Sequence, residues 1–249
     1  MMEFSVDGRF GALWQGVQRI LLPPHCLLCD QRSDGVGDLC SGCRADLQRN
    51  RICCPRCALP LQTPAPLCGE CLRSAPPFDA AFAPYLYIHP LDLLVTKLKF
   101  GRSLAAGRVL SELWLDAISE RAPPLPDLLV PVPLHTSRLR ERGYNQALEL
   151  ARPLAAALRI PLAAGLLART KATVAQTNLD ARARRRNLRG AFEFHGAGAH
   201  AAELKSAHVA LIDDVMTTGT TLRECARVLR GVGVARVDVW AFARAPKSG

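Results

Sequence analysis

The stretch VALIDDVMTTGTTL, residues 209–222, decides how the rest of this chain is interpreted. Its first five residues, Val209 to Asp213, predict a buried parallel strand, because a short apolar run ends there in acidic residues. A Thr- and Gly-rich turn follows, and a helix is expected from about Leu222. Unpaired N–H groups at the helix start, the positive end of its dipole and the threonine hydroxyls would converge on one anion. The stretch therefore predicts a phosphate site, to which hydroxyls are offered by Thr217, Thr218, Thr220 and Thr221.

The two adjacent acids, Asp213 and Asp214, would repel that anion. They suit the hydroxyls of a sugar attached to the phosphate, or a metal ion nearby. The structural alternative is a strand, turn and helix with an Asp N-cap and no ligand. A strand ending in two acids also resembles the Mg-binding strand of P-loop NTPases, but no lysine in this chain follows a glycine as that motif requires.

The same stretch resembles the signature of the type I phosphoribosyltransferases, an apolar strand ending in two acids and followed by a T-T-G-x-T loop. The resemblance implies that the acids hold the ribose hydroxyls of 5-phosphoribosyl-1-pyrophosphate (PRPP), with Mg²⁺, while the loop holds its 5-phosphate. Many members carry a second glycine where this chain has Thr220, so the fit around the phosphate differs here. The PRPP-binding residues implied are Asp213, Asp214, Val215, Met216, Thr217, Thr218, Gly219, Thr220 and Thr221.

Composition indicates a globular protein. The chain has 249 residues and 49% hydrophobic content, enough for one sizeable core and a small module. No run approaches the roughly 18 apolar residues of a membrane span, and the N-terminus lacks the features of a signal peptide. A cytoplasmic location without a membrane span is therefore expected.

Nine of the ten cysteines fall between Cys26 and Cys71, mostly in pairs spaced for metal. A C-x2-C-x10-C-x2-C pattern occurs twice with a uniform offset of 28 residues. This duplication predicts two closed, structural four-thiolate zinc sites, although iron or disulfide pairing stays open as an alternative. The ligands are Cys26, Cys29, Cys40, Cys43, Cys54, Cys57, Cys68 and Cys71.

Three further questions about these sites stay open at this point. The spacing does not say whether the cysteine pairs combine in order or cross over between the two sites. Cys53 could replace Cys54 as a ligand, and His25 could be recruited, although each has a more ordinary alternative. Cys225 is expected to be a buried apolar filler.

The cysteine-rich segment contains few large apolar residues, so metal binding would supply its folding free energy. The segment Phe10–Leu22 has helical apolar spacing and is expected to dock on a neighbouring face. Prolines at 76 and 77 indicate a boundary there. We therefore expect an N-terminal helix and double zinc ribbon over 1–77 and a second domain over 78–249.

Positive charge is concentrated between Arg138 and Arg189, where 12 Lys/Arg stand against three acids. A solvated basic face is the ordinary explanation of such a run. However, Arg138, Arg140 and Arg142 are expected in a loop after a strand. A second group, from Arg182 to Arg186, would point in several directions on any helix.

Residues 127–132 (DLLVPV) predict the first core strand, followed by a loop at 134–143 and a helix from about Tyr144 to Leu158. Together with the strand, loop and helix after residue 209, this is an alternating β/α pattern. It predicts an α/β fold with a parallel sheet flanked by helices, whose loops gather at the carboxyl ends of the strands. The basic loop and the phosphate loop would then open into one crevice.

Several motifs in this order resemble the competence protein F family of phosphoribosyltransferase-like proteins, from about Cys26 to Ala243. They are the double cysteine module, PVPLHTSRLRERGYNQA at residues 131–147, the pattern Q-x-x-L-x-x-x-x-R-x-x-N and a following Gly-Ala-Phe. The resemblance implies a type I phosphoribosyltransferase-like domain behind a double zinc ribbon. It also implies a link to DNA uptake.

Carried onto these positions, the resemblance assigns roles to the basic segments. Loop 133–146 would contact the pyrophosphate, and segment 169–187, beginning with Arg169, would lie where the enzymes place a lid. The implied pyrophosphate-side or nucleic-acid contacts are Arg138, Arg142, Gly143, Asn145, Gln146, Gln176, Arg182 and Arg185. No catalytic residue is identified; the candidates are Arg142, Lys171 and Arg184.

The acceptor is not identified by the sequence. Residues 85–89 predict a short strand and 91–100 a helix, which ends with Lys97 and Lys99. These lysines would cap the helix dipole or reach towards the ligand. This region would recognise the acceptor, but it has few polar residues that could identify a base.

Three functions remain: transfer of phosphoribose from PRPP to an unidentified acceptor, binding of single-stranded DNA, and regulation by PRPP or a nucleotide without turnover. Few aromatic residues weaken an independent stacking surface for DNA. The leading interpretation is a PRPP-binding protein that acts in DNA uptake or processing, with single-stranded DNA and competence or recombination proteins as further partners.

Overall fold

The computed structural model describes residues 24–33, 37–171, 188, 190–196 and 204–247. The chain divides into two compact units, residues 1–46 and residues 47–249, here called the N-terminal unit and the sheet unit. In the N-terminal unit, the short helix α2 (Ser41–Ala45) follows Cys40, whose sulfur accepts a hydrogen bond from Cys43 N. The helix expected over Phe10–Leu22 lies outside the described residues.

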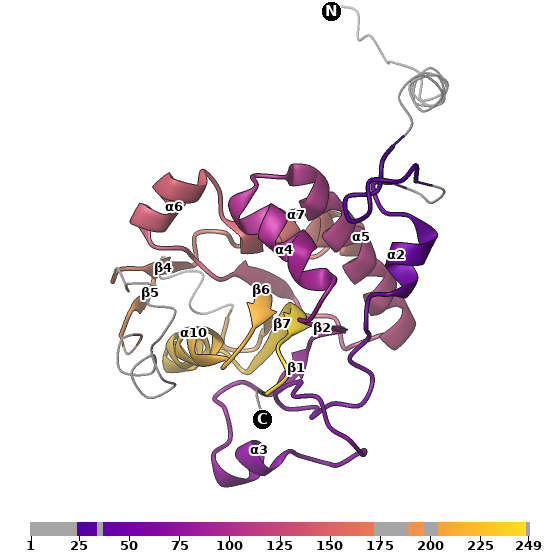
Figure 1. The fold of residues 1–249 in the computed structure, drawn as a ribbon. Coiled ribbons are helices and arrows are strands. Elements are labelled where there is room, and N and C mark those ends of the chain that lie inside the picture. Colours follow the sequence, from indigo (N-terminus) through magenta and orange to yellow (C-terminus); the bar gives the residue numbers. More distant parts are fainter. Residues whose placement is uncertain (1–23, 34–36, 172–187, 189, 197–203, 248–249) are drawn as a thin grey trace, which may run out of the picture. The chain divides into compact units, whose positions relative to one another are not determined.

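The sheet unit is built on five parallel strands (Figure 1). The order is β1 (Ala80–Phe82), β7 (Arg236–Arg244), β6 (His208–Met216) and β3 (Leu128–Pro131). The two-residue strand β2 (Tyr85–Leu86) pairs with the end of β7, beyond β1. The predicted parallel α/β sheet is thus confirmed, and the strand expected over 127–132 is β3.

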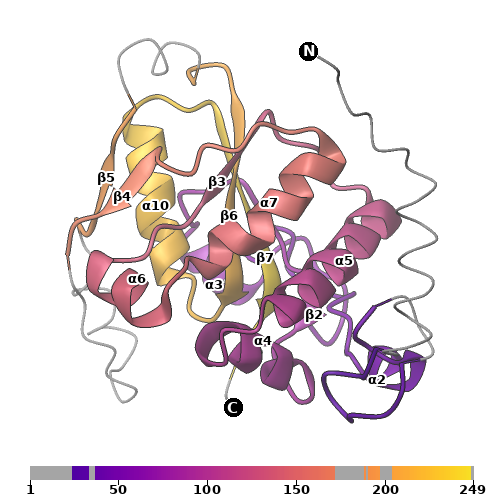
Figure 2. The same ribbon diagram turned by 90° about the horizontal axis from the view of Figure 1, so that it is seen from above.

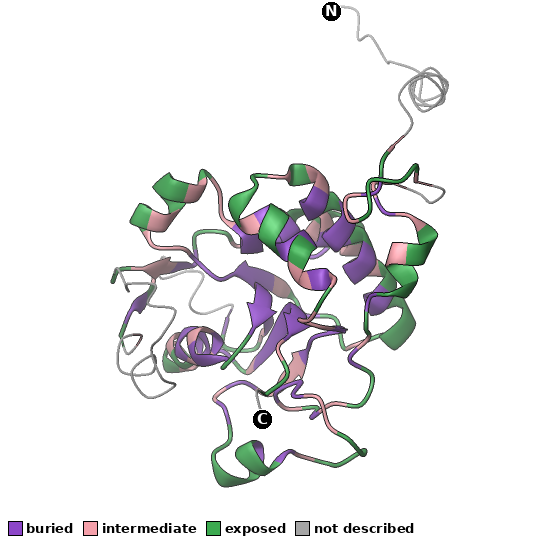
Figure 3. Ribbon diagram, in the orientation of Figure 1, coloured by how far each residue is buried: buried purple, intermediate pink, exposed green. Residues whose placement is uncertain are grey.

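Helices cover both faces of the sheet. In Figures 1 and 2, α4 (Leu91–Phe100), α5 (Leu104–Arg121) and α7 (Gln146–Leu158) lie on one face, and α10 (Thr220–Gly231) lies on the other. Successive side chains of a strand point to opposite faces, so Val209 and Leu211 join the core cluster that contains Leu222 of α10. Because both faces are buried (Figure 3), β6 and β7 are almost continuous apolar runs.

The basic segment after β3 differs from the prediction. Residues 134–143 were expected as a loop, but Thr136–Arg142 form the helix α6, capped by the His135 side chain at its start and ended by Gly143 with φ +84°. Helix α7 begins at Gln146 rather than Tyr144, because the Asn145 side chain accepts a hydrogen bond from Ala147 N at 3.0 Å. Arg138 and Arg140 therefore lie on a helix, not on a loop.

Two further strands, β4 (Leu167–Arg169) and β5 (Phe192–Phe194), pair with each other in an antiparallel ribbon and form a sheet separate from the main one. No helix among the described residues is both long enough and apolar enough to cross a membrane.

The second group of cysteines, Cys54 to Cys71, belongs to the sheet unit. Its four cysteines are buried and share one core cluster with Val237 and Val239 of β7. The short helix α3 (Gly69–Arg73) carries the last of them. Along the chain, the division between the two compact units falls between residues 46 and 47. The domain boundary near residue 77, which the sequence indicates, stays a prediction.

Candidate functional site

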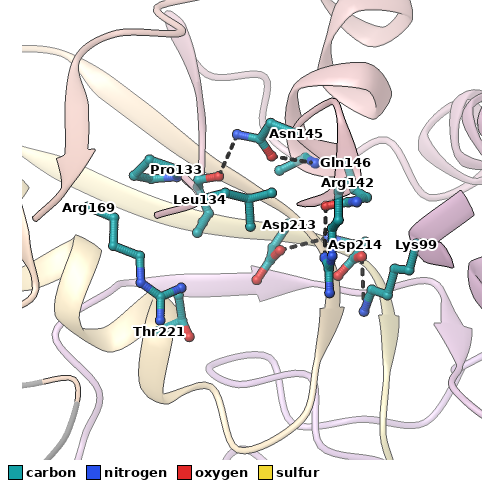
Figure 4. A pocket seen from close by; sticks show the side chains of 12 residues that line it. Lys99, Pro133, Leu134, Arg142, Asn145, Gln146, Arg169, Asp213, Asp214 and Thr221 are labelled. Carbon is teal, nitrogen blue, oxygen red and sulfur yellow. Dashed lines mark hydrogen bonds and ion pairs between the residues drawn. The ribbon is translucent and has the colours of Figure 1, made fainter. Parts of the chain in front are cut away.

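A cavity of about 130 Å³ lies at the carboxyl ends of β3 and β6, among the loops that follow them. Figure 4 shows Arg169 and Thr221 on one side of it, Lys99, Arg142 and Asp214 on the other, and Asp213 between them. Its charged side chains are three cations and two acids. The lining residues are Lys99, Val132, Pro133, Leu134, Arg142, Asn145, Gln146, Ala147, Arg169, Asp213, Asp214 and Thr221.

The two acids are held by the strand itself. β6 was expected to end at Asp213, but it continues to Met216, because β7 goes on pairing with it as far as Arg244. Consecutive strand residues point to opposite faces, yet both carboxyl groups line the cavity near the carboxyl end of β6. Asp214 is buried and Asp213 is partly buried.

The Asp213 carboxyl resists ionisation. Burial, and then repulsion from Asp214, raise its pKa to about 7, while the nearby charges of Lys99 and Arg169 act in the opposite direction. A carboxyl group in this state is stabilised by any ligand that brings positive charge or hydroxyl donors to it. Repulsion between the two acids is therefore one of the costs of ionising Asp213 in this cavity.

Lys99 forms an ion pair with one of these acids, whereas the sequence alone allows it either to cap the helix dipole or to reach the ligand. Its Nζ lies 3.0 Å from Asp214 Oδ2, so it reaches the site rather than merely capping α4. The end of α4 is held there by Tyr144, whose hydroxyl donates to the Leu98 carbonyl, and by the Arg142 guanidinium over the Phe100 ring at 5.2 Å. Tertiary packing therefore brings together Lys99 and Asp214, which are 115 residues apart in the sequence.

Replacing this cation provides a first test. In Lys99→Met we expect the pKa of Asp213 to rise further above its ordinary value, because a charge that favours the carboxylate is removed. The measurement is the ¹³C chemical shift of the Asp213 carboxyl between pH 4 and 9. Lys97→Met is the matched control, since Lys97 is exposed in the same helical turn and does not line the cavity. An unchanged titration midpoint of Asp213 in Lys99→Met would show that the charge of Lys99 does not favour the Asp213 carboxylate.

The predicted phosphate loop turns sharply at Gly219, whose φ of +70° lies in the left-handed region that disfavours other residues. Helix α10 begins at the next residue, so its first N–H groups have no partners within the helix. Thr217 and Thr218 are exposed, and the hydroxyls of Thr218 and Thr220 lie 2.9 Å apart. Thr221 is the threonine of this loop that lines the cavity.

On the same side of the cavity as Asp214, the segment that joins α6 to α7 supplies hydrogen-bond donors. Arg142 Nη1 donates to Gln146 Oε1 at 3.0 Å, and Asn145 Nδ2 donates to the Val132 carbonyl at 3.0 Å. Arg142 Nε and Gln146 Nε2 are buried and, within the described part of the chain, find no hydrogen-bond partner. Buried donors of this kind are costly unless a ligand or water accepts from them.

Arg169 was expected at the start of a lid segment and lines the cavity from the end of β4. Burial lowers the pKa of its guanidinium, which also lies 5.5 Å from the centre of the Phe192 ring. Arg138, Gly143 and Lys171 do not line the cavity, and Lys171 is exposed. Gln176, Arg182, Arg184 and Arg185 lie outside the described residues.

Two groups of four cysteines are assembled in the order of the sequence. Within each group, all four sulfurs lie within 4.8 Å of one another. The distance between the sulfur atoms is 3.7 Å for Cys29 and Cys40 and 3.6 Å for Cys57 and Cys68. Both are close to the roughly 3.8 Å edge of a tetrahedron with 2.3 Å Zn–S bonds. The cysteines therefore fit two zinc ions, and the pairs do not cross over between sites.

The two alternative ligands, Cys53 and His25, have other surroundings. Cys53 is not part of either group, and the Arg121 guanidinium lies 4.0 Å from its sulfur. His25 Nδ1 lies 3.0 Å from the Asp30 carbonyl. Cys225 is fully buried in α10, as expected of an apolar filler.

Comparison with known proteins extends these observations. Residues 17–72 match the model of the double zinc ribbon domain, and residues 145–249 match that of the phosphoribosyl transferase domain. The chain is 37% identical over 230 residues to the DNA utilization protein YhgH of Salmonella typhi, which covers 90% of this chain and 99% of the relative. The chain belongs to the competence protein F/YhgH family.

Another member of the competence protein F/YhgH family is competence protein F of Haemophilus influenzae, 38% identical over 211 residues, or 83% of this chain and 90% of the relative. Among solved structures, a purine phosphoribosyltransferase from Pyrococcus horikoshii covers 56% of this chain and 82% of its own, with 14% identity and a TM-score of 0.33. Lys99 and Arg142 precede the residues matched by the phosphoribosyl transferase model, and the geometry brings both to the cavity.

Proposed function

We propose that this chain binds PRPP with Mg²⁺ at the cavity beside β6 and acts in DNA uptake or processing. One observation carries the proposal: Thr221 of the loop that turns at Gly219, a pair of acids and two partly buried arginines, Arg142 and Arg169, line one cavity. The order of these features matches the order of groups along PRPP, a phosphate, a ribose and a pyrophosphate. The names of the relatives, which refer to competence and to DNA utilization, support the biological role.

Each part of PRPP would be bound by residues whose charge or hydrogen-bonding groups suit it. The loop 217–221 would receive the 5-phosphate through N–H groups at the start of α10. Asp213 and Asp214 would accept hydrogen bonds from the ribose hydroxyls. Arg142, across the cavity from Thr221, would face the pyrophosphate, to which its Nε and the Gln146 amide would donate.

The donor set also fits Mg²⁺, which prefers carboxylate and phosphate oxygens. Asp213 and Asp214 would lie beside an ion carried by the pyrophosphate, and that ion would neutralise charge on the leaving group.

Phosphoribosyl transfer is the reaction that such a complex would undergo. The bond between the anomeric carbon and a pyrophosphate oxygen would break, its electron pair would leave with the pyrophosphate, and the acceptor would form the new bond to carbon. Of the three catalytic candidates, Arg142 lines the cavity and would stabilise the departing charge, whereas Lys171 does not line it and Arg184 lies outside the described residues. The acceptor stays unidentified.

Calorimetry tests binding directly. We expect Mg–PRPP to bind with a dissociation constant in the micromolar range, and ribose 5-phosphate and pyrophosphate each to bind at least about tenfold more weakly, since each fills part of the site. Omitting Mg²⁺ should weaken PRPP binding. No heat and no thermal stabilisation with millimolar Mg–PRPP would reject the proposal. An assay for released pyrophosphate, run with candidate acceptors, then separates an enzyme from a regulator that binds without turnover.

Single-stranded DNA is the second candidate ligand, because residues 138–189 carry 12 Lys/Arg against three acids. Phosphate-led binding would fall steeply as salt is added, since counterions are released on binding. The measurement is fluorescence anisotropy of a labelled oligonucleotide at 50 and 200 mM salt. Competition by Mg–PRPP would place both ligands at one site, and its absence would place DNA elsewhere.

A further inference from the structure

Arg244 is a buried charge that the proposed ligand site does not use. It is the last residue of β7, it is 5% exposed, and it does not line the cavity. Its backbone lies between Met216 of β6 and Leu86 of β2. A buried guanidinium is costly unless its donors are satisfied, so the position of these donors indicates what the residue holds together.

On one side, Arg244 contacts the second cysteine cluster, defined as Cys54, Cys57, Cys68 and Cys71. Its Nε donates to the Cys57 carbonyl at 3.1 Å. Cys57 is a ligand in the knuckle of this cluster, and its sulfur lies 3.6 Å from that of Cys68. Four thiolates around one Zn²⁺ leave a net charge of about −2, which a neighbouring guanidinium stabilises.

On the other side, Arg244 contacts the start of the phosphate loop. Its Nη1 donates to the Met216 carbonyl at 2.9 Å and also to the Thr217 carbonyl. One side chain thus bridges a metal knuckle and the loop that carries Thr217 to Thr221.

The bridge fixes the direction of loop amides. In a trans peptide the C=O and the N–H point in opposite directions within one plane. Arg244 draws the carbonyls of Met216 and Thr217 towards itself, so the N–H groups of Thr217 and Thr218 are directed away from it. Directed N–H groups are what an anion-binding loop needs.

We propose that Arg244 couples zinc in the second cysteine cluster to the conformation of the phosphate loop. Zinc fixes the Cys57 knuckle, Arg244 transmits its position to the Met216 and Thr217 carbonyls, and the loop amides are thereby preorganised for phosphate. Coupling between two sites is reciprocal, so a ligand on the loop also retains the zinc. The effect of a phosphate ligand on zinc retention rests on the proposed function, whereas the effect of zinc and Arg244 on the loop conformation does not.

The test uses the full chain with Cys26→Ser/Cys29→Ser, so that zinc is held by the second cluster alone. In this background Arg244→Met is compared with Arg227→Met, a control in which an exposed arginine of α10, paired with Glu224, is removed. Amide exchange is followed in the peptide spanning 216–221, and zinc release is followed with a chromogenic chelator. We expect Arg244→Met to raise both rates roughly tenfold, and Arg227→Met to match the parent.

Mg–PRPP supplies the second arm. In the parent it should slow zinc release at least about tenfold, and in Arg244→Met the slowing should be lost at ligand concentrations that saturate the variant. Parental values for loop exchange and zinc release in Arg244→Met would overturn the proposal, as would equal slowing by Mg–PRPP in both proteins. If Arg244→Met does not fold, Arg244→Lys, which keeps the charge but not the fork of donors, is measured in its place. Failure of the parent to bind Mg–PRPP rejects the proposed function alone, because the first arm still decides the coupling.

Discussion

Cys54→Ser is expected to unfold the sheet unit, whereas Cys29→Ser is expected to leave that unit folded. Cys54 is fully buried in the core cluster shared with β7, while Cys29 is exposed in the other compact unit. Structural zinc contributes about 10–16 kcal/mol to the folding of small zinc peptides, which is as large as the whole stability of many domains. Losing the zinc ion of the Cys54–Cys71 group is therefore expected to cost more than the free energy of unfolding of the sheet unit.

Tryptophan fluorescence distinguishes the two variants, because Trp114 and Trp240 are both buried in the sheet unit. We expect Cys54→Ser to show the red-shifted emission of exposed tryptophan at 25 °C. Cys29→Ser should melt within about a degree or two of the wild type by this probe while binding one zinc instead of two. Equal destabilisation by both substitutions would show that the two cysteine groups support one cooperative unit.

Asp213→Asn is expected to abolish Mg–PRPP binding, with a loss of affinity of at least about 100-fold. The asparagine keeps the acceptor that receives the Asp214 N–H at 3.0 Å, so the loop geometry is preserved. It removes the charge that would hold the ribose hydroxyls and face the Mg²⁺, and interactions with charged groups are worth roughly 1.5–3 kcal/mol each. Calorimetry measures the loss, and binding within threefold of the wild type would contradict the role given to this acid.

The same substitution is expected to stabilise the ligand-free protein in a pH-dependent way. The pKa of Asp213 is raised in the folded state to about 7, from an ordinary value of 3.8, so the folded state holds a proton that the unfolded state has lost. Wild-type stability therefore falls as pH rises from about 4 to 7, by an amount of order 2–4 kcal/mol. Asp213→Asn should match the wild type near pH 4 and melt several degrees higher at pH 8. If Asp213→Asn melted at a higher temperature than the wild type only at pH 4, the pH dependence would have the opposite sign, and a raised pKa of Asp213 in the folded state would be contradicted.

Local patterns in the sequence were sufficient to predict a strand carrying Asp213 and Asp214 and a turn before the next helix, although the strand runs on to Met216. An apolar run, two aspartates and a Thr/Gly turn each have a strong local preference, and the parallel sheet followed from the alternation of strands and helices. The helix α6 was missed even though its signals are present. His135 caps it and Gly143 ends it in the left-handed region, a pattern that indicates a helix end as much as a loop.

Other parts of the site could not be predicted, because they depend on tertiary packing. Lys99 reaches Asp214 only because Tyr144 holds the end of α4 beside the turn before α7. Arg244 ends an apolar strand, and nothing in its neighbours in sequence indicates that Cys57 and Thr217 lie on either side of it. The order of zinc pairing is also invisible in the spacing, since identical C-x2-C knuckles fit either arrangement.

The strand order has a consequence for how this chain is synthesised. β1 and β2 pair with β7, so Ala80 meets Asp238 and Tyr85 meets Ala243 across more than 150 residues. Contacts this distant in sequence form slowly, and on a ribosome they wait until β7 has emerged. The cysteines between Cys54 and Cys71 are close in sequence and complete a metal site long before then. We therefore expect zinc capture to precede sheet closure during translation, which protects reactive thiols while the central strand is still missing.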